Sequence, residues 1–219
     1  MDGIFANRGY AVLQMNFRGS SGFGFDFMKS GLKQWGLQMQ DDITDGVHWL
    51  TDNGIADKKR ICIVGASYGG YAALMGAATT PDLYRCAISF AGVSNLIDFL
   101  KFRRHFVNKK VVEQQIGSLF KDADQMRATS PQNLVDRIKI PVLLVHGSND
   151  PIVPVGQSRD MAAALKKAGK PYQYIELEEG DHWLSSYDHR LRLFQEMEKF
   201  LAANLGTGEV NVTSNQETH

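Results

Sequence analysis

Short apolar runs alternate with amphipathic segments along most of this 219-residue chain. Most of the runs are continuously apolar, which is typical of strands buried on both faces of a parallel sheet, and the segments between them have helical spacing. We predict strands over residues 10–17, 60–66, 86–91, 141–146 and 172–177, and helices over residues 35–53, 71–79, 156–168 and 187–204. The alternation predicts an α/β architecture, a mostly parallel sheet flanked by helices.

The longest interval between predicted strands covers residues 95–140 and contains a helical pattern at 109–120. Two interpretations are open: a solvated helical insertion, or a cap that shapes access to a pocket at the strand ends. We expect one domain over residues 1–205. The polar, aperiodic residues 206–219 predict a disordered tail.

The charges balance, with 24 Lys+Arg against 24 Asp+Glu, which argues against a nucleic-acid partner. No apolar stretch reaches the ~20 residues of a membrane span, and the N-terminus lacks a secretory pattern, so we expect no membrane partner and a cytoplasmic location. Cys62 and Cys86 lie in apolar runs that are predicted as neighbouring strands. We expect buried free thiols there rather than a disulfide.

The strongest chemical signal is Gly-x-Ser-x-Gly at residues 65–69, between an apolar run and a helix of small residues. This strand–turn–helix context is that of a nucleophile elbow, in which a strained turn exposes the hydroxyl of Ser67. The two glycines keep Cβ atoms out of the crowded turn. The helix that follows directs its electropositive start at any oxyanion formed beside Ser67.

A serine hydroxyl needs a base within hydrogen-bonding reach and an acid that orients the base. Of the six histidines, His182 alone lies in a loop directly after the final predicted strand, at the same rim as Ser67. Asp150 follows the preceding strand in a proline-stiffened loop. The chain order Ser67, Asp150, His182 is that of the α/β-hydrolase arrangement.

Four motifs in order resemble the catalytic domain of the prolyl oligopeptidase family of serine peptidases. They are NFRGSSGFG at residues 16–24, GASYGGY at 65–71, HGSND at 146–150 and GDH at 180–182. The similarity covers about residues 9–201 and points to the acylaminoacyl-peptidase and dipeptidyl-peptidase-like branches. It implies an α/β-hydrolase fold with Ser67 as nucleophile, Asp150 as orienting acid and His182 as base.

The resemblance implies a serine peptidase or hydrolase that cleaves short peptides or acylated and aminoacyl amides through an acyl-enzyme on Ser67. Two alternatives stay open: a carboxylesterase that acts on small esters, and a weakly active or inactive fragment. The expected partner is a small peptide or ester substrate.

The chain departs from the family's pattern at its N-terminus. Neither the family's β-propeller nor the first strand of its hydrolase domain, with the oxyanion loop after it, precedes Asn7. We therefore expect an incomplete domain that lacks its first strands. Because open sheet edges favour association, we also expect a fragment or a homo-oligomer formed through exposed or exchanged edges.

Three further residues are candidates for oxyanion or substrate binding. The N–H of Tyr68 is the identifiable oxyanion donor, and its ring is a candidate pocket wall. For Arg18 we favour a brace of the glycine-rich turn over a substrate contact. Trp183 either lines the site or packs. Asp41, Asp42 and Asp45 fit a helix face, and no cofactor or metal is expected.

Overall fold

Four short parallel strands form the centre of the molecule, described here by a computed structural model of residues 2–206. The strand order along the sheet is β1-β2-β3-β4. The strands are β1 (Cys62–Ala66), β2 (Cys86–Phe90), β3 (Val142–Gly147) and β4 (Tyr172–Leu177). Every residue of β2 and β3 is buried, as their continuous apolar sequences predict.

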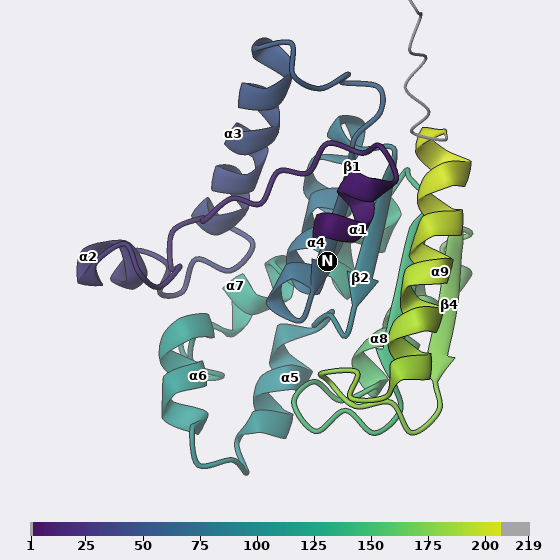
Figure 1. Cartoon of the computed structure of the whole chain (residues 1–219). Helices are drawn as coiled ribbons and strands as arrows, with labels where there is room; N and C mark the ends of the chain where they lie inside the picture. The colour runs from purple at the N-terminus through teal and green to yellow at the C-terminus, as the bar shows by residue number, and fades with distance from the viewer. Residues whose placement is uncertain (1, 207–219) are drawn as a thin grey trace, which may run out of the picture.

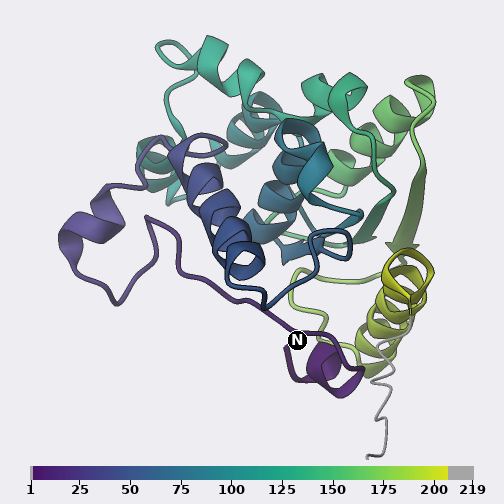
Figure 2. The same ribbon diagram turned by 90° about the horizontal axis from the view of Figure 1, so that it is seen from above.

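Helices cover both faces of this sheet (Figure 1). One face carries α3 (Gln38–Asp52), α4 (Tyr68–Thr79) and α8 (Gly156–Lys167). The other carries α9 (Tyr187–Leu205) and the short α1 (Asp2–Asn7). Figure 2 shows the resulting three layers from above.

Alternate residues of the two central strands pack on opposite faces of the sheet. Ile88 and Val145 join the apolar cluster beneath α9, whereas Ala87 and Leu144 join the cluster beneath α4 and α8. Two-sided burial therefore explains why these strands are apolar at successive positions.

The long interval between β2 and β3 folds into a helical layer of its own. It consists of α5 (Leu96–Arg103), α6 (Lys109–Ile116), α7 (Ala123–Ala128) and the 3-10 helix η2 (Pro131–Arg137). Phe99, Ile116 and Met126 pack against Tyr71 and Met75 of α4. The segment is therefore packed against the domain rather than merely solvated. The predicted helix over 109–120 ends at Ile116, since Gly117 takes a positive φ of 133°.

The remaining helices are short. They are α2 (Phe25–Lys29) and the 3-10 helix η1 (Pro81–Leu83). α2 projects away from the sheet in both views (Figure 1, Figure 2). The predicted helix over 35–53 begins only at Gln38, because Gly36 has a φ of 72° and approaches the Tyr71 hydroxyl too closely to carry a side chain.

The strand predicted over residues 10–17 is wrong. This segment has no regular secondary structure, and its Met15 side chain packs against Gly46 of α3. A strand needs a neighbour with which to exchange backbone hydrogen bonds, and within residues 2–206 none lies beside this segment. β1 is consequently one edge strand of the described sheet, and β4 is the other. Association through a sheet edge stays a prediction.

The expectation of free thiols is also wrong. Cys62 and Cys86 lie opposite each other in the β1–β2 register, with Cα atoms 4.8 Å apart, and the structure joins them in a disulfide. That separation lies within the range a disulfide can bridge. Two cysteines in apolar runs are compatible with buried thiols or with a cross-strand disulfide, because the sequence does not show whether their Cα atoms lie close enough to be bridged.

Two other expectations concern the ends of the chain and membranes. The disordered tail predicted over residues 206–219 lies outside the described residues except for Gly206. Between residues 2 and 206, no helix is both long enough and apolar enough to cross a bilayer.

Candidate active site

Ser67 occupies a sharp turn between β1 and α4. Its backbone has φ 56° and ψ −118°, a left-handed conformation that is rare for a residue with a side chain. Its N–H donates to the Phe90 carbonyl of the neighbouring strand over 2.9 Å. A Cβ atom at Gly65 would collide with the carbonyl of Gly69, so the turn requires glycine there.

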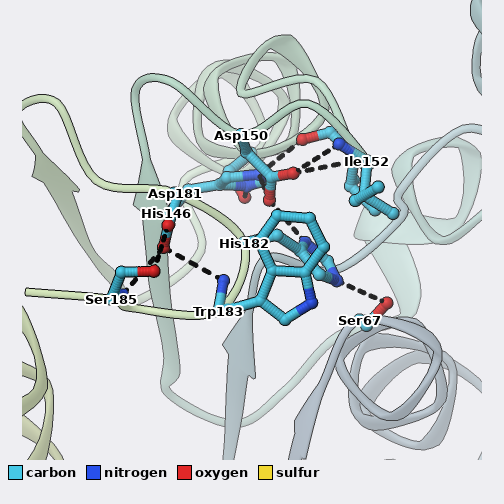
Figure 3. Close-up of polar contacts among 10 residues, drawn as sticks. Ser67, His146, Asp150, Ile152, Asp181, His182, Trp183 and Ser185 are labelled. Carbon is cyan, nitrogen blue, oxygen red and sulfur yellow. Dashed lines mark hydrogen bonds and ion pairs between the residues drawn. The ribbon is translucent and has the colours of Figure 1, made fainter.

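His182 lies in the loop that follows β4 and faces this serine (Figure 3). Its Nε2 atom is 3.1 Å from Ser67 Oγ. The carboxylate of Asp181 accepts from the N–H groups of Trp183 and Ser185, so it fixes the loop's own backbone. The imidazole is thereby presented to the serine by a closed turn.

Asp150 lies in the loop after β3 and faces the other side of the imidazole. Its Oδ2 atom is 2.6 Å from His182 Nδ1, and its Oδ1 atom accepts from the N–H groups of Ile152 and Val153 at 2.8 and 2.9 Å. Figure 3 shows the three side chains in one line from carboxylate to hydroxyl. The sequence-predicted serine, histidine and aspartate therefore lie together at the carboxyl ends of β1, β4 and β3.

The Asp150 side chain is wholly buried, and desolvation alone would raise its pKa. Hydrogen bonds from the rings of His146 and His182, and from the Val153 and Ile152 N–H groups, outweigh desolvation and hold the pKa well below its usual range. Asp150 is therefore ionised and accepts a hydrogen bond from the Nδ1–H of His182. This leaves His182 Nε2 as the nitrogen that accepts from the serine hydroxyl.

The backbone N–H and the ring of Tyr68 lie in different surroundings. As the first residue of α4, its N–H has no intrahelical acceptor and lies next to Ser67. Its ring packs against Phe17 and Trp35, with centroids 5.1 and 4.6 Å away. Burial raises the pKa of its phenol. The ring is thus part of an aromatic cluster with Phe17 and Trp35.

The other two candidate residues lie in contrasting settings. Arg18 makes a two-pronged ion pair with Asp42 of α3, at 2.6 and 2.8 Å, which braces the glycine-rich turn against that helix. Trp183 is 65% exposed, and its ring meets His182 edge-on with centroids 5.9 Å apart. Trp183 therefore stands at the open rim rather than in the core.

His146 is a site residue that the sequence reasoning passed over as a strand end. It is fully buried, and its Nε2 atom lies 3.2 Å from Asp150 Oδ2. The available signal was a lone polar side chain that closes an otherwise apolar strand, next to the loop that carries the acid.

The loops that carry Asp150 and His182 touch through their backbones. A Cβ atom at Gly147 would collide with the carbonyl of Gly180. We expect Gly147→Ala to destabilise the domain by about 1–3 kcal/mol, because one backbone must shift, and to lower kcat by displacing the two loops from each other. Chemical denaturation together with steady-state kinetics measures both effects.

Gly156→Ala is the matched control. Gly156 begins α8, and a Cβ atom there would meet nothing within 4 Å. We expect this variant to match or slightly exceed the wild type in stability. Equal behaviour of the two variants would contradict the importance of the Gly147–Gly180 contact.

Comparison with known proteins shows which family is similar in sequence to this chain. The model of the prolyl oligopeptidase family matches residues 3–208. Dipeptidyl aminopeptidase BIII of Pseudoxanthomonas mexicana is 36% identical over 207 residues, covering 92% of this chain and 30% of the relative. The mouse acylamino-acid-releasing enzyme (Mus musculus) is 26% identical, with coverages of 91% and 28%.

Two solved structures that resemble this chain are also peptidases. A puromycin-hydrolyzing peptidase of Mycobacterium tuberculosis has a TM-score of 0.82 at 33% identity, covering 88% of this chain and 29% of that one. The acylaminoacyl peptidase of Pyrococcus horikoshii has a TM-score of 0.80 at 29% identity, with coverages of 89% and 32%. This chain thus spans about a third or less of each protein's length, and the neighbours confirm the predicted α/β-hydrolase fold. Since the family model matches almost all of its described residues, the chain belongs to the prolyl oligopeptidase family.

Proposed function

We propose that this chain is a serine hydrolase that cleaves short peptides or acylated and aminoacyl amides through an acyl-enzyme on Ser67. The observation that carries the proposal is the continuous hydrogen-bonded series from Asp150 through His182 to Ser67 Oγ. A buried carboxylate, an oriented imidazole and a hydroxyl on a strained turn are the parts that serine acyl transfer needs.

In the first half-reaction, His182 Nε2 takes the proton of Ser67 as Oγ attacks the substrate carbonyl carbon. The ionised Asp150 stabilises the resulting imidazolium without taking its proton. The N–H of Tyr68 donates to the developing oxyanion. The imidazolium then protonates the leaving amine, the C–N bond breaks, and the acyl group stays on Ser67.

In the second half-reaction, water replaces the amine. His182 removes a proton from the water as its oxygen attacks the acyl carbon, and returns that proton to Ser67 Oγ when the ester bond breaks. The products are a carboxylic acid and the free serine. The imidazole thus passes the first proton to the amine and the second to Ser67, and the enzyme ends in its starting state.

The names of the relatives support the substrate class. These names describe a peptidase acting on dipeptidyl units, an enzyme that releases acylamino acids, and a peptidase that hydrolyses puromycin. We therefore place short peptides and acylated or aminoacyl amides first among the substrates of this chain.

A carboxylesterase is the second candidate, and the small number of identified oxyanion donors is the reason to test it. Within residues 2–206, the Tyr68 N–H is the one oxyanion donor that we identify, and loss of a single donor costs about 10²–10³ in rate. Esters expel their leaving group more readily than amides and tolerate such a weak site better. Parallel assays with p-nitrophenyl esters and aminoacyl p-nitroanilides distinguish the two activities.

Labelling with a fluorophosphonate tests the proposal directly, because only an activated serine reacts quickly with this reagent. We expect a single adduct that mass spectrometry maps to Ser67, and no adduct in heat-denatured protein. Absence of labelling in folded protein, or an adduct on another serine, would contradict the proposed nucleophile.

A further inference from the structure

We propose that His146 is a positioning residue that orients the carboxylate of Asp150 toward His182. This inference rests on the proposed function, because Asp150 matters for turnover only if Ser67 and His182 perform acyl transfer. His146 does not touch Ser67 or the substrate's carbonyl in this proposal. It acts through Asp150, from the opposite side to His182.

The hydrogen-bond partners of His146 determine its tautomer. Its Nε2 atom lies 2.9 Å from the Val153 carbonyl and 3.2 Å from Asp150 Oδ2. Both are acceptors, so Nε2 must carry the hydrogen; it donates to the Val153 carbonyl, and the Asp150 carboxylate lies beside the same N–H. The ring is fully buried, and a bare nitrogen facing two negative oxygens there would be strongly repelled.

The opposite ring nitrogen has the complementary partner. His146 Nδ1 is 2.7 Å from Ser158 Oγ, whose hydroxyl donates when Nδ1 is unprotonated. Ser158 is held in place by its neighbour Gln157, whose side-chain Oε1 accepts from the N–H groups of Ser94 and Asn95. The start of α8 thereby fixes the ring from the side away from Asp150.

Together these contacts leave the Asp150 carboxylate little freedom. Its Oδ1 atom accepts two backbone N–H groups, and its Oδ2 atom lies between two imidazoles. His146 also ties the Val153 carbonyl to the same turn. Without the His146 donor, the carboxylate would have room to rotate away from His182, and the turn from 150 to 153 would lose a brace.

Two substitutions at one position separate this role from simple filling of space. In His146→Gln the side-chain amide nitrogen reaches the former Nε2 position, whereas in His146→Asn it reaches only the Nδ1 position. Because a hydrogen bond to a charged group contributes more than a neutral one, we expect His146→Asn to lower kcat about tenfold or more, with KM within about twofold. His146→Gln should retain kcat within about threefold.

Equal losses in both variants would mean that His146 only fills the core, and unchanged kcat in both would mean that Asp150 needs no brace. Either result overturns the proposal. Turnover is measured on whichever p-nitrophenyl ester or aminoacyl p-nitroanilide the wild type cleaves.

A second pair of variants guards against misfolding at this buried position. Ser158→Ala keeps His146 but removes the donor to Nδ1, and should lower kcat about threefold. Ser89→Ala is its matched control, since Ser89 is also fully buried and its hydroxyl has no partner within the described residues. Indistinguishable kcat values for these two variants would contradict the proposal.

Nuclear magnetic resonance of protein labelled with ¹⁵N-histidine gives a readout independent of turnover. We expect His146 as the Nε2–H tautomer, and a downfield Nδ1–H proton of His182 that moves in His146→Asn and stays in His146→Gln. If both signals are as expected but the chain cleaves none of the substrates, the hydrolase proposal fails while the hydrogen bonds around His146 are supported. If the chain cleaves substrate but the Nδ1–H signal of His182 does not change in the His146 variants, the positioning role is wrong and the hydrolase proposal is unaffected.

Discussion

Replacing Ser67 with alanine is expected to lower kcat by about 10⁶, because the only group that attacks the carbonyl is removed. The fold should persist, since within residues 2–206 the hydroxyl bonds only to His182, and the backbone contact with Phe90 is retained. Steady-state kinetics on the ester and anilide substrates measures the loss. Circular dichroism and the thermal midpoint show whether the domain stays folded. Wild-type turnover by Ser67→Ala on every substrate would refute the assignment of the nucleophile.

Addition of His182→Ala to this variant provides an internal check. Residues that act as one unit are not additive, so the double variant should be no slower than either single variant. A double variant slowed by the product of the two single effects would mean that the serine and the histidine act independently.

Asp150→Asn is expected to lower kcat by about 10⁴ while leaving the geometry nearly unchanged. The asparagine oxygen must stay where the Ile152 and Val153 N–H groups donate, so its NH₂ group takes the place of Oδ2. That NH₂ group then faces His182 Nδ1, which must become an acceptor. The hydrogen moves to Nε2, and the imidazole no longer accepts the proton of Ser67.

The control for this variant is Asp160→Asn. Asp160 is an exposed carboxylate on α8, and its loss should change kcat by less than twofold. A normal rate in Asp150→Asn would show that the buried carboxylate has no part in turnover.

The sheet was predictable from sequence where each strand is buried on both faces. β2 and β3 carry apolar residues at successive positions, and this signal depends on burial alone. Residues 10–17 carry a similar signal yet form no strand, because a strand also requires a hydrogen-bonding neighbour. An apolar sequence shows that a segment favours burial but not whether a neighbour buries it: Val12 and Leu13 are each 41% exposed.

The same distinction applies to the site. Ser67, Asp150 and His182 were predictable because each follows a strand, and parallel strands bring their carboxyl ends to one edge. Arg18 was favoured as a brace from the sequence, and in the structure it pairs with Asp42, a partner that was not identified. His146 and the Cys62–Cys86 disulfide were missed because their roles depend on which side chains face each other across neighbouring elements. One sequence carries no direct record of such pairings.

The contact between Gly147 and Gly180 has a consequence for how the site tolerates change. Main-chain atoms hold the two loops together at this contact, so exposed side chains in them are freer to differ than Asp150 and His182. Exposed positions such as Trp183 at the rim are therefore suitable for mutagenesis libraries aimed at new substrate preferences. Such libraries should keep both glycines, so that variation of the rim leaves the geometry of the acid and the base intact.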